Sequence, residues 1–165
     1  MKKNLQSLLS LLQQQYKLYN DLYYVLDEEY EHLSNSDTDA IRKVVDTKYK
    51  FIDKIDELEF KRVKLCEEIA KELNLNEEAR LSVIAQYTDE DTAKTLLTWK
   101  GTFEALLTNI KEKNDINNMM ASAALESVES TIDAMKDALQ TTDVYQNKGS
   151  KKSGDQVEHL LSKKV

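Results

Sequence analysis

The sequence predicts an all-α fold, an elongated antiparallel helical bundle of three long helices plus one short helix, followed by a flexible C-terminal tail. The chain of 165 residues contains no proline and three glycines, so it has few of the residues that hairpins and tight turns require. Charged residues make up 32% of it, and apolar residues recur between them at helical spacing. This pattern favours long helices with solvated outer faces.

A heptad seam predicts the first helix, over about residues 5–33. Its apolar residues recur in alternating steps of four and three: Leu5, Leu9, Leu12, Tyr16, Tyr19, Tyr23, Leu26, Tyr30 and Leu33. Other apolar residues widen this stripe, as a bundle of three or more helices requires: Leu8, Leu11, Leu18, Leu22 and Val25. The sequence SNSDTD then ends the seam, and Ser36 with Asp39 forms a start signal for the next helix.

The second helix is predicted from about Thr38 to Leu73, with two cations on its seam. Lys48 and Arg62 either extend their stems over the core and pair with acids of a neighbouring helix, or lie at the rim of the seam. The sequence NLN ends this helix, and a short helix capped by Asn76 is expected through about residue 86.

The last helix is predicted to begin at a cap formed by Thr88 and to carry an apolar stripe from Leu96 to Leu139. Asn114 and Asn117 lie on that stripe, so a kink or a hydrated patch is expected there. Residues 1–140 therefore form a predicted helical bundle domain. Residues 141–165 have low hydrophobicity and form a predicted flexible tail with a short amphipathic segment.

Charge and composition exclude several classes of protein. A formal net charge of −7 disfavours nucleic acid or an anionic membrane as the main partner. No stretch reaches the roughly 18 apolar residues that a membrane span needs, so membrane insertion is not expected. The single cysteine, Cys66, suits a reducing compartment, and the expected location is the cytoplasm.

The sequence offers few groups for catalysis, and no catalytic residue, metal site or cofactor is expected. The two histidines, His32 and His159, lie at a helix end and in the tail. Glu29 and His32 form the E-x-x-H pair of di-iron bundles, but the second such pair that those bundles require is missing. Cys66 is interpreted as a small buried hydrophobic residue. The protein is therefore not expected to be an enzyme.

Four segments in order carry a resemblance to a known family: DEEYEHLSNSD, KYKFIDKIDELEFKRVKL, NDINN and YQNKG. Over about residues 1–150 the chain resembles the FlgN-type flagellar export chaperones. The resemblance rests on these residues: Glu28 or Glu29, Asp39, Lys48, Leu58, Glu59, Arg62, Asn114, Asn117 or Asn118, Tyr145 and Gly149.

This resemblance implies a cytoplasmic, non-enzymatic chaperone of flagellar type III secretion. Such a protein binds hook-associated (hook-filament junction) proteins before export and delivers them to the export gate. It also implies that Tyr145, near the end of the last helix, docks on that gate. From the residues alone, Tyr145 packed on the end of the bundle is an equal alternative.

The last helix is also the expected client-binding surface, because the first two helices pair with each other and leave it with spare apolar positions. The expected client-binding residues are Leu125, Val128, Ile132, Met135 and Leu139. Val157, Leu160 and Leu161 of the tail are expected to become ordered only on a partner. The alternative is a non-enzymatic coiled-coil scaffold or tether that forms a homodimer through its helical stripe.

Overall fold

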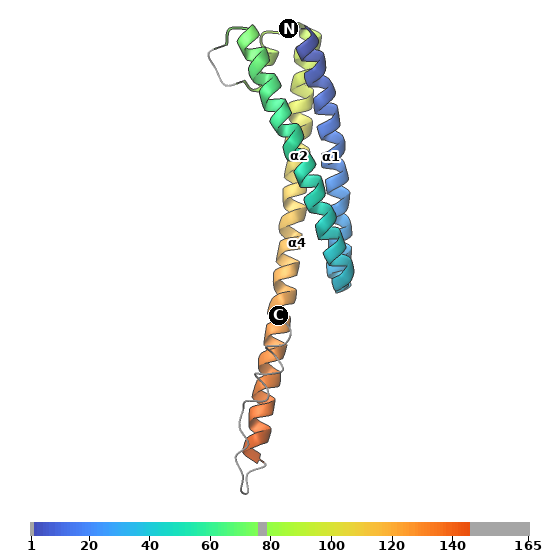
Figure 1. Cartoon of the computed structure of the whole chain (residues 1–165), viewed down its shortest axis with the longest axis vertical. Coiled ribbons are helices and arrows are strands. Elements are labelled where there is room, and N and C mark those ends of the chain that lie inside the picture. Colours follow the sequence, from blue (N-terminus) through green and yellow to red (C-terminus); the bar gives the residue numbers. More distant parts are fainter. Residues whose placement is uncertain (1, 76–78, 146–165) are drawn as a thin grey trace. The chain divides into compact units, whose positions relative to one another are not determined.

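Helices are the regular secondary structure of the described residues, which confirms the predicted all-α fold class. The computed structural model describes residues 2–75 and 79–145, with side chains described up to residue 137. Its helices are α1 (Lys2–Ser34), α2 (Thr38–Glu72), α3 (Leu81–Ala85) and α4 (Glu90–Tyr145) (Figure 1), and none of the described residues is in a strand. The chain divides into two compact units, Met1–Ser122 and Ala123–Val165.

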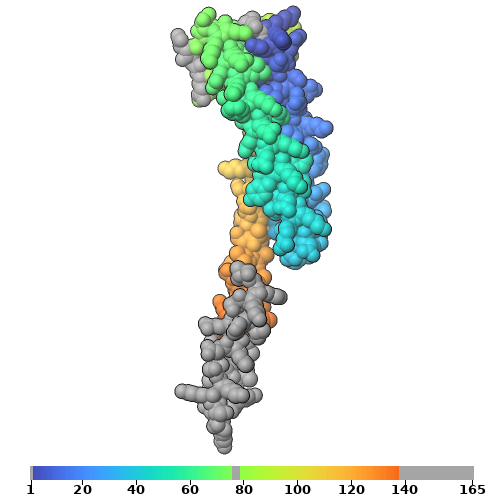
Figure 2. Space-filling view, viewed as in Figure 1, coloured from blue at the N-terminus to red at the C-terminus, as the bar shows by residue number. Residues whose placement is uncertain are grey.

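Helices α1 and α2 form an antiparallel pair and lie against each other (Figures 1 and 2). A tight turn joins them. Asp37 N–H donates to His32 O (3.1 Å) and Ser36 N–H donates to Leu33 O (3.2 Å), while Ser36 adopts a left-handed backbone with φ of 55°. This arrangement closes the end of α1.

The cap of α2 lies one residue later than the sequence analysis placed it. Because Ser36 closes α1, the N-cap of α2 is Asp37, whose carboxylate accepts a hydrogen bond from Ala40 N–H (3.0 Å). The predicted cap at Ser36 is therefore wrong, although the start of the helix at Thr38 is right.

The buried seam of α1 differs from the prediction. Its buried residues are Leu5, Leu8, Leu11, Leu12, Gln15, Leu22, Val25, Leu26 and Glu29. Tyr16 and Tyr30, which were predicted on the seam, are exposed. The prediction counted only apolar residues and so passed over the heptad series that contains Gln15 and Glu29, because both of these residues are polar.

All four helices contribute to the core of the unit Met1–Ser122. This core contains Leu5, Leu8, Leu12, Cys66, Ile69, Ile84, Ala85 and Leu96. Aromatic contacts add to the packing of α4 on α1: the ring centroids of Tyr16 and Trp99 are 5.6 Å apart, and those of Tyr19 and Phe103 are 5.8 Å apart. Cys66 is buried in this core, as the sequence predicted.

Helix α3 is shorter than predicted, since it spans Leu81–Ala85, and the expected cap Asn76 lies outside the described residues.

Helix α4 begins after Asp89, whose carboxylate accepts a hydrogen bond from Thr92 N–H (3.0 Å). The predicted cap at Thr88 is wrong, because the hydroxyl of Thr88 donates instead to Ala85 O (3.0 Å).

Helix α4 is continuous through Asn114 and Asn117, where the sequence suggested a kink or a hydrated patch. Asn117 is buried and hydrogen-bonded to α1, and the expected hydrated patch at these asparagines stays a prediction. The helix extends to Tyr145, and the proposed division of the chain at residue 140 stays a prediction.

Candidate functional site

The interior of the unit Met1–Ser122 contains three buried polar side chains. Gln15, Glu29 and Asn117 are only 1%, 5% and 1% exposed. Burying a charged or polar group costs free energy unless it is paired or hydrogen-bonded. Each of these side chains belongs to a polar layer that crosses the apolar core.

The first layer joins three helices and is called the Glu29 layer: Glu29 from α1, Lys48 from α2 and Asn117 from α4. Lys48 Nζ lies 2.6 Å from Glu29 Oε1, and both side chains are largely buried. Asn117 Nδ2 donates to Glu29 Oε2 (2.8 Å) and to the backbone oxygen of Leu26 (2.9 Å). One carboxylate therefore binds a cation from α2 and an amide from α4.

Two features border the Glu29 layer. Lys113 of α4 forms an ion pair with Asp27 of α1, and its ammonium lies 4.0 Å from the centroid of the Tyr23 ring. Asn117 Oδ1 is buried and accepts no hydrogen bond from the described residues. The α1–α4 contact at this level thus combines charge, cation–π and amide interactions.

The second layer is called the Glu59 layer and contains Gln15, Glu59 and Arg62. Gln15 Nε2 donates to Glu59 Oε2 (2.9 Å), and Arg62 binds both oxygens of Glu59, with its Nε 2.8 Å from Oε2. These hydrogen bonds, mainly those from Arg62, hold the pKa of the Glu59 carboxyl below its ordinary value, although burial acts in the opposite direction.

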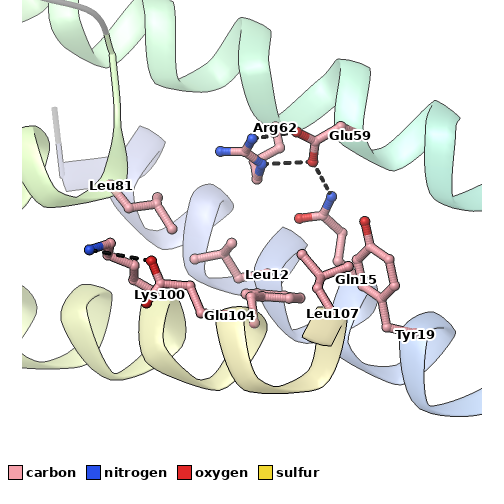
Figure 3. A pocket seen from close by; sticks show the side chains of 10 residues that line it. Leu12, Gln15, Tyr19, Glu59, Arg62, Leu81, Lys100, Glu104 and Leu107 are labelled. Atoms are coloured by element: carbon pink, nitrogen blue, oxygen red, sulfur yellow. Dashed lines mark hydrogen bonds and ion pairs between the residues drawn. The ribbon is translucent and has the colours of Figure 1, made fainter. Parts of the chain in front are cut away.

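A cavity of about 230 Å³ lies beside the Glu59 layer (Figure 3). Its apolar walls come from α1, α3 and α4: Leu12, Leu81, Phe103 and Leu107. Lys100 and Glu104 of α4 form an ion pair of 3.4 Å at the same site. Burial raises the pKa of the Tyr19 phenol in this cavity, so the hydroxyl is neutral at physiological pH.

The described residues show no arrangement suited to holding a metal ion. No group of three or more His, Cys, Asp or Glu residues among them could do so. Glu29 of the E-x-x-H pair is instead engaged by Lys48 and Asn117. Burial raises the pKa of the Cys66 thiol, which disfavours the nucleophilic thiolate. The hydrogen bonds of the polar layers join side chains of different helices.

Part of these layers was predictable from the sequence. The prediction that Lys48 pairs with an acid of a neighbouring helix is confirmed, whereas Arg62 pairs with Glu59 of its own helix. Gln15 was missed entirely. The sequence does contain a signal for the two layers, which is the spacing of their polar residues. Gln15 and Glu29 are two heptads apart on α1, and Lys48 and Arg62 are two heptads apart on α2.

The predicted client-binding residues lie in the unit Ala123–Val165. Four of their side chains are described and exposed: Leu125 (60%), Val128 (55%), Ile132 (36%) and Met135 (62%). The side chains of Leu139 and Tyr145 lie outside the described residues, although both positions are helical. Val157, Leu160 and Leu161 also lie outside the described part.

A bundle held by buried polar layers, with an exposed apolar stripe on its last helix, defines a class of helical proteins suited to binding other proteins. The FlgN protein family model matches residues 1–153, and the chain belongs to this family. No curated protein and no solved structure matches the chain significantly.

FlgN proteins are flagellar export chaperones, which bind flagellar proteins during flagellum assembly, and the family is not known for enzymatic activity. This result confirms the family to which the sequence was assigned by resemblance. Within residues 2–75 and 79–145, no helix is long and apolar enough to cross a membrane.

Removing Lys48 tests the Glu29 layer. The Lys48→Met variant leaves the carboxylate of Glu29 buried without its cation, so we expect the free energy of unfolding to fall by about 3–5 kcal/mol. Lys50→Met, an exposed change on the same helix, should cost less than about 0.5 kcal/mol. Urea unfolding followed by circular dichroism measures both, and a Lys48→Met cost no larger than that of Lys50→Met would contradict the account.

The lowered pKa of Glu59 predicts a dependence of stability on pH. The pKa of Glu59 is lower in the folded than in the unfolded chain. The ionised carboxylate therefore stabilises the folded chain fully at pH values above its unfolded pKa of about 4.3, and this stabilisation is lost as the pH falls through its folded pKa. Glu59→Gln should therefore flatten the acid limb of a stability–pH curve. A carboxyl-carbon NMR titration in which Glu59 titrates at or above the ordinary value would refute this prediction.

Proposed function

We propose that the chain is a cytoplasmic chaperone that binds hook-associated flagellar proteins before export and delivers them to the export gate. Membership of the FlgN family supports the general role of a flagellar export chaperone. The observation that carries the finer proposal is the row of exposed apolar side chains on α4, from Leu125 to Met135.

These side chains have the spacing of one helix face. Leu125, Val128, Ile132 and Met135 follow one another in steps of three, four and three, and Leu139 continues the series. An exposed apolar row of this kind is typical of a surface that another helix covers. We therefore assign client binding to Leu125, Val128, Ile132, Met135 and Leu139, which together are called the client stripe.

A charge placed in the client stripe tests this assignment. Ile132→Asp should weaken binding of a hook-associated protein by about 2–4 kcal/mol, because the client would bury an unpaired carboxylate. Ser130→Asp is the matched control, since it adds the same charge to an exposed position on the opposite side of the same helix.

Isothermal titration calorimetry with both folded variants gives the comparison. If Ile132→Asp and the wild type bind the client with equal affinity, the client stripe is not part of the binding surface. If the free wild-type chain is instead a stable dimer that Ile132→Asp dissociates without any effect on client binding, the stripe belongs to a scaffold.

We assign docking on the export gate to Tyr145, the last residue of α4. A tyrosine supplies a large, rather rigid contact surface and a hydroxyl at modest entropic cost. Tyr145→Ala should weaken binding to the gate by about 2 kcal/mol or more and leave client affinity and melting temperature nearly unchanged. Tyr145→Phe is the control for loss of the hydroxyl alone. A lower melting temperature with normal gate binding would make Tyr145 a structural residue.

The tail that follows α4 is proposed to become ordered when a partner binds. Its apolar residues Val157, Leu160 and Leu161 fall on one face of a helix too short to be stable alone. Ordering this segment would oppose binding by about 2–5 kcal/mol. Hydrogen exchange in the free chain should be fast in this tail, and protection there equal to that of α2 without any partner would refute the proposal.

A further inference from the structure

The pair α1–α2 carries a groove that α4 does not line. Two hollows of about 480 Å³ and 520 Å³ are formed by α1 and α2 side chains alone, and they share Gln14. Their α1 residues run from Ser7 to Asp21, which corresponds to about 21 Å of helix. This length accommodates about four turns of another helix.

The floor of the groove is apolar and follows a heptad repeat. Leu11 and Leu18 are seven residues apart on α1, and three floor residues are spaced by seven on α2: Phe51, Leu58 and Leu65. Leu11 is buried and the other four are half-buried. Rows with this spacing form the holes that receive side chains of a further helix in a coiled coil.

The α2 wall of the groove is basic in a chain whose net charge is −7. This wall contains three lysines and two acids: Lys54, Lys61, Lys64, Glu57 and Glu68. Lys43 and Lys50 lie on the same side of α2, because residues 43, 50, 57 and 64 follow one another at a spacing of seven. The α1 wall is mixed and contains one lysine and one acid, Lys17 and Asp21.

None of these lysines forms an ion pair within the described residues. Lys54 and Lys64 lie over the rings of Phe51 and Phe60, at 5.6 Å and 4.3 Å from the ring centroids. Their charges are therefore available to acidic groups of a partner.

We propose that this groove binds an amphipathic helix of a partner protein, with an apolar heptad stripe and acidic residues along the flank that faces α2. The heptad floor selects a helix, and the basic wall selects its charge. A second copy docking groove to groove would place the same lysine wall against itself, because a two-fold contact pairs a surface with its own copy. The site uses no residue of the client stripe, so the two surfaces are separate.

A designed peptide of about three heptads is a suitable probe for the full chain. The acidic form has leucine at the two apolar heptad positions and glutamate at the flanking positions, and the basic form has lysine in place of glutamate. Fluorescence anisotropy should show that the acidic peptide binds and the basic peptide does not. The Lys54→Glu/Lys61→Glu variant should weaken binding of the acidic peptide by about tenfold.

The matched control is Lys94→Glu/Lys111→Glu, which makes the same charge change at exposed positions of α4 outside the groove. It should change the peptide affinity by less than about twofold. The Ile132→Asp variant should also bind the acidic peptide normally, so failure of the client stripe and failure of the groove can be distinguished.

Three outcomes would overturn the proposal. The acidic peptide does not bind the wild-type chain, or its affinity is unchanged in Lys54→Glu/Lys61→Glu while that variant remains folded. In the third outcome, light scattering finds a wild-type dimer that the groove variant dissociates, which would assign the groove to a second copy of the chain.

Discussion

The ion pair between Glu29 and Lys48, with Asn117 on the same carboxylate, is the constraint on which the rest of the bundle depends. Leucine-rich seams repeat every seven residues, so α1 and α2 could slide by one heptad and still bury apolar side chains. A slide would leave the carboxylate of Glu29 buried without its cation, at a cost of several kcal/mol. The pair therefore selects one register among several that the leucines allow.

The same register aligns the other contacts of the unit Met1–Ser122. It brings Gln15 to Glu59, two heptads from the Glu29 layer, and places the cavity beside that second layer. Asn117 fixes the position of α4 along α1, where the aromatic contacts of Trp99 and Phe103 also lie. The client stripe begins later, at Leu125. Helix α4 thus uses its first part for the core and has apolar residues left over for a client.

Periodicity was enough to predict the three long helices, because long amphipathic helices repeat over many turns. It failed at Ser36 and Thr88, since a serine or threonine before an aspartate looks like a cap whichever of the two residues makes the hydrogen bond. It also placed Tyr16 on the buried seam, because an apolar pattern cannot recognise a buried Gln15 or Glu29 whose partner comes from another helix. Such partners depend on the three-dimensional structure.

The residues that carried the family resemblance have a related explanation. Some of these residues lie in the two polar layers: Lys48, Glu59, Arg62 and, of the alternatives considered, Glu29 and Asn117. These residues of the resemblance therefore lie where helices contact one another. The client stripe was predicted separately, from the spare apolar positions of the last helix, and four of its side chains are exposed on α4.

Replacing the Glu29 layer with apolar residues tests the central claim that this layer selects the register. In the full chain, the triple variant Glu29→Leu/Lys48→Met/Asn117→Leu should keep or gain stability, by up to about 4 kcal/mol, because the cost of burying the charges disappears. An amide proton–nitrogen correlation spectrum should nevertheless show more than one peak for many residues of α1 and α2, since several registers become populated. A single set of sharp peaks, with the wild-type contacts between α1 and α2, would contradict the account.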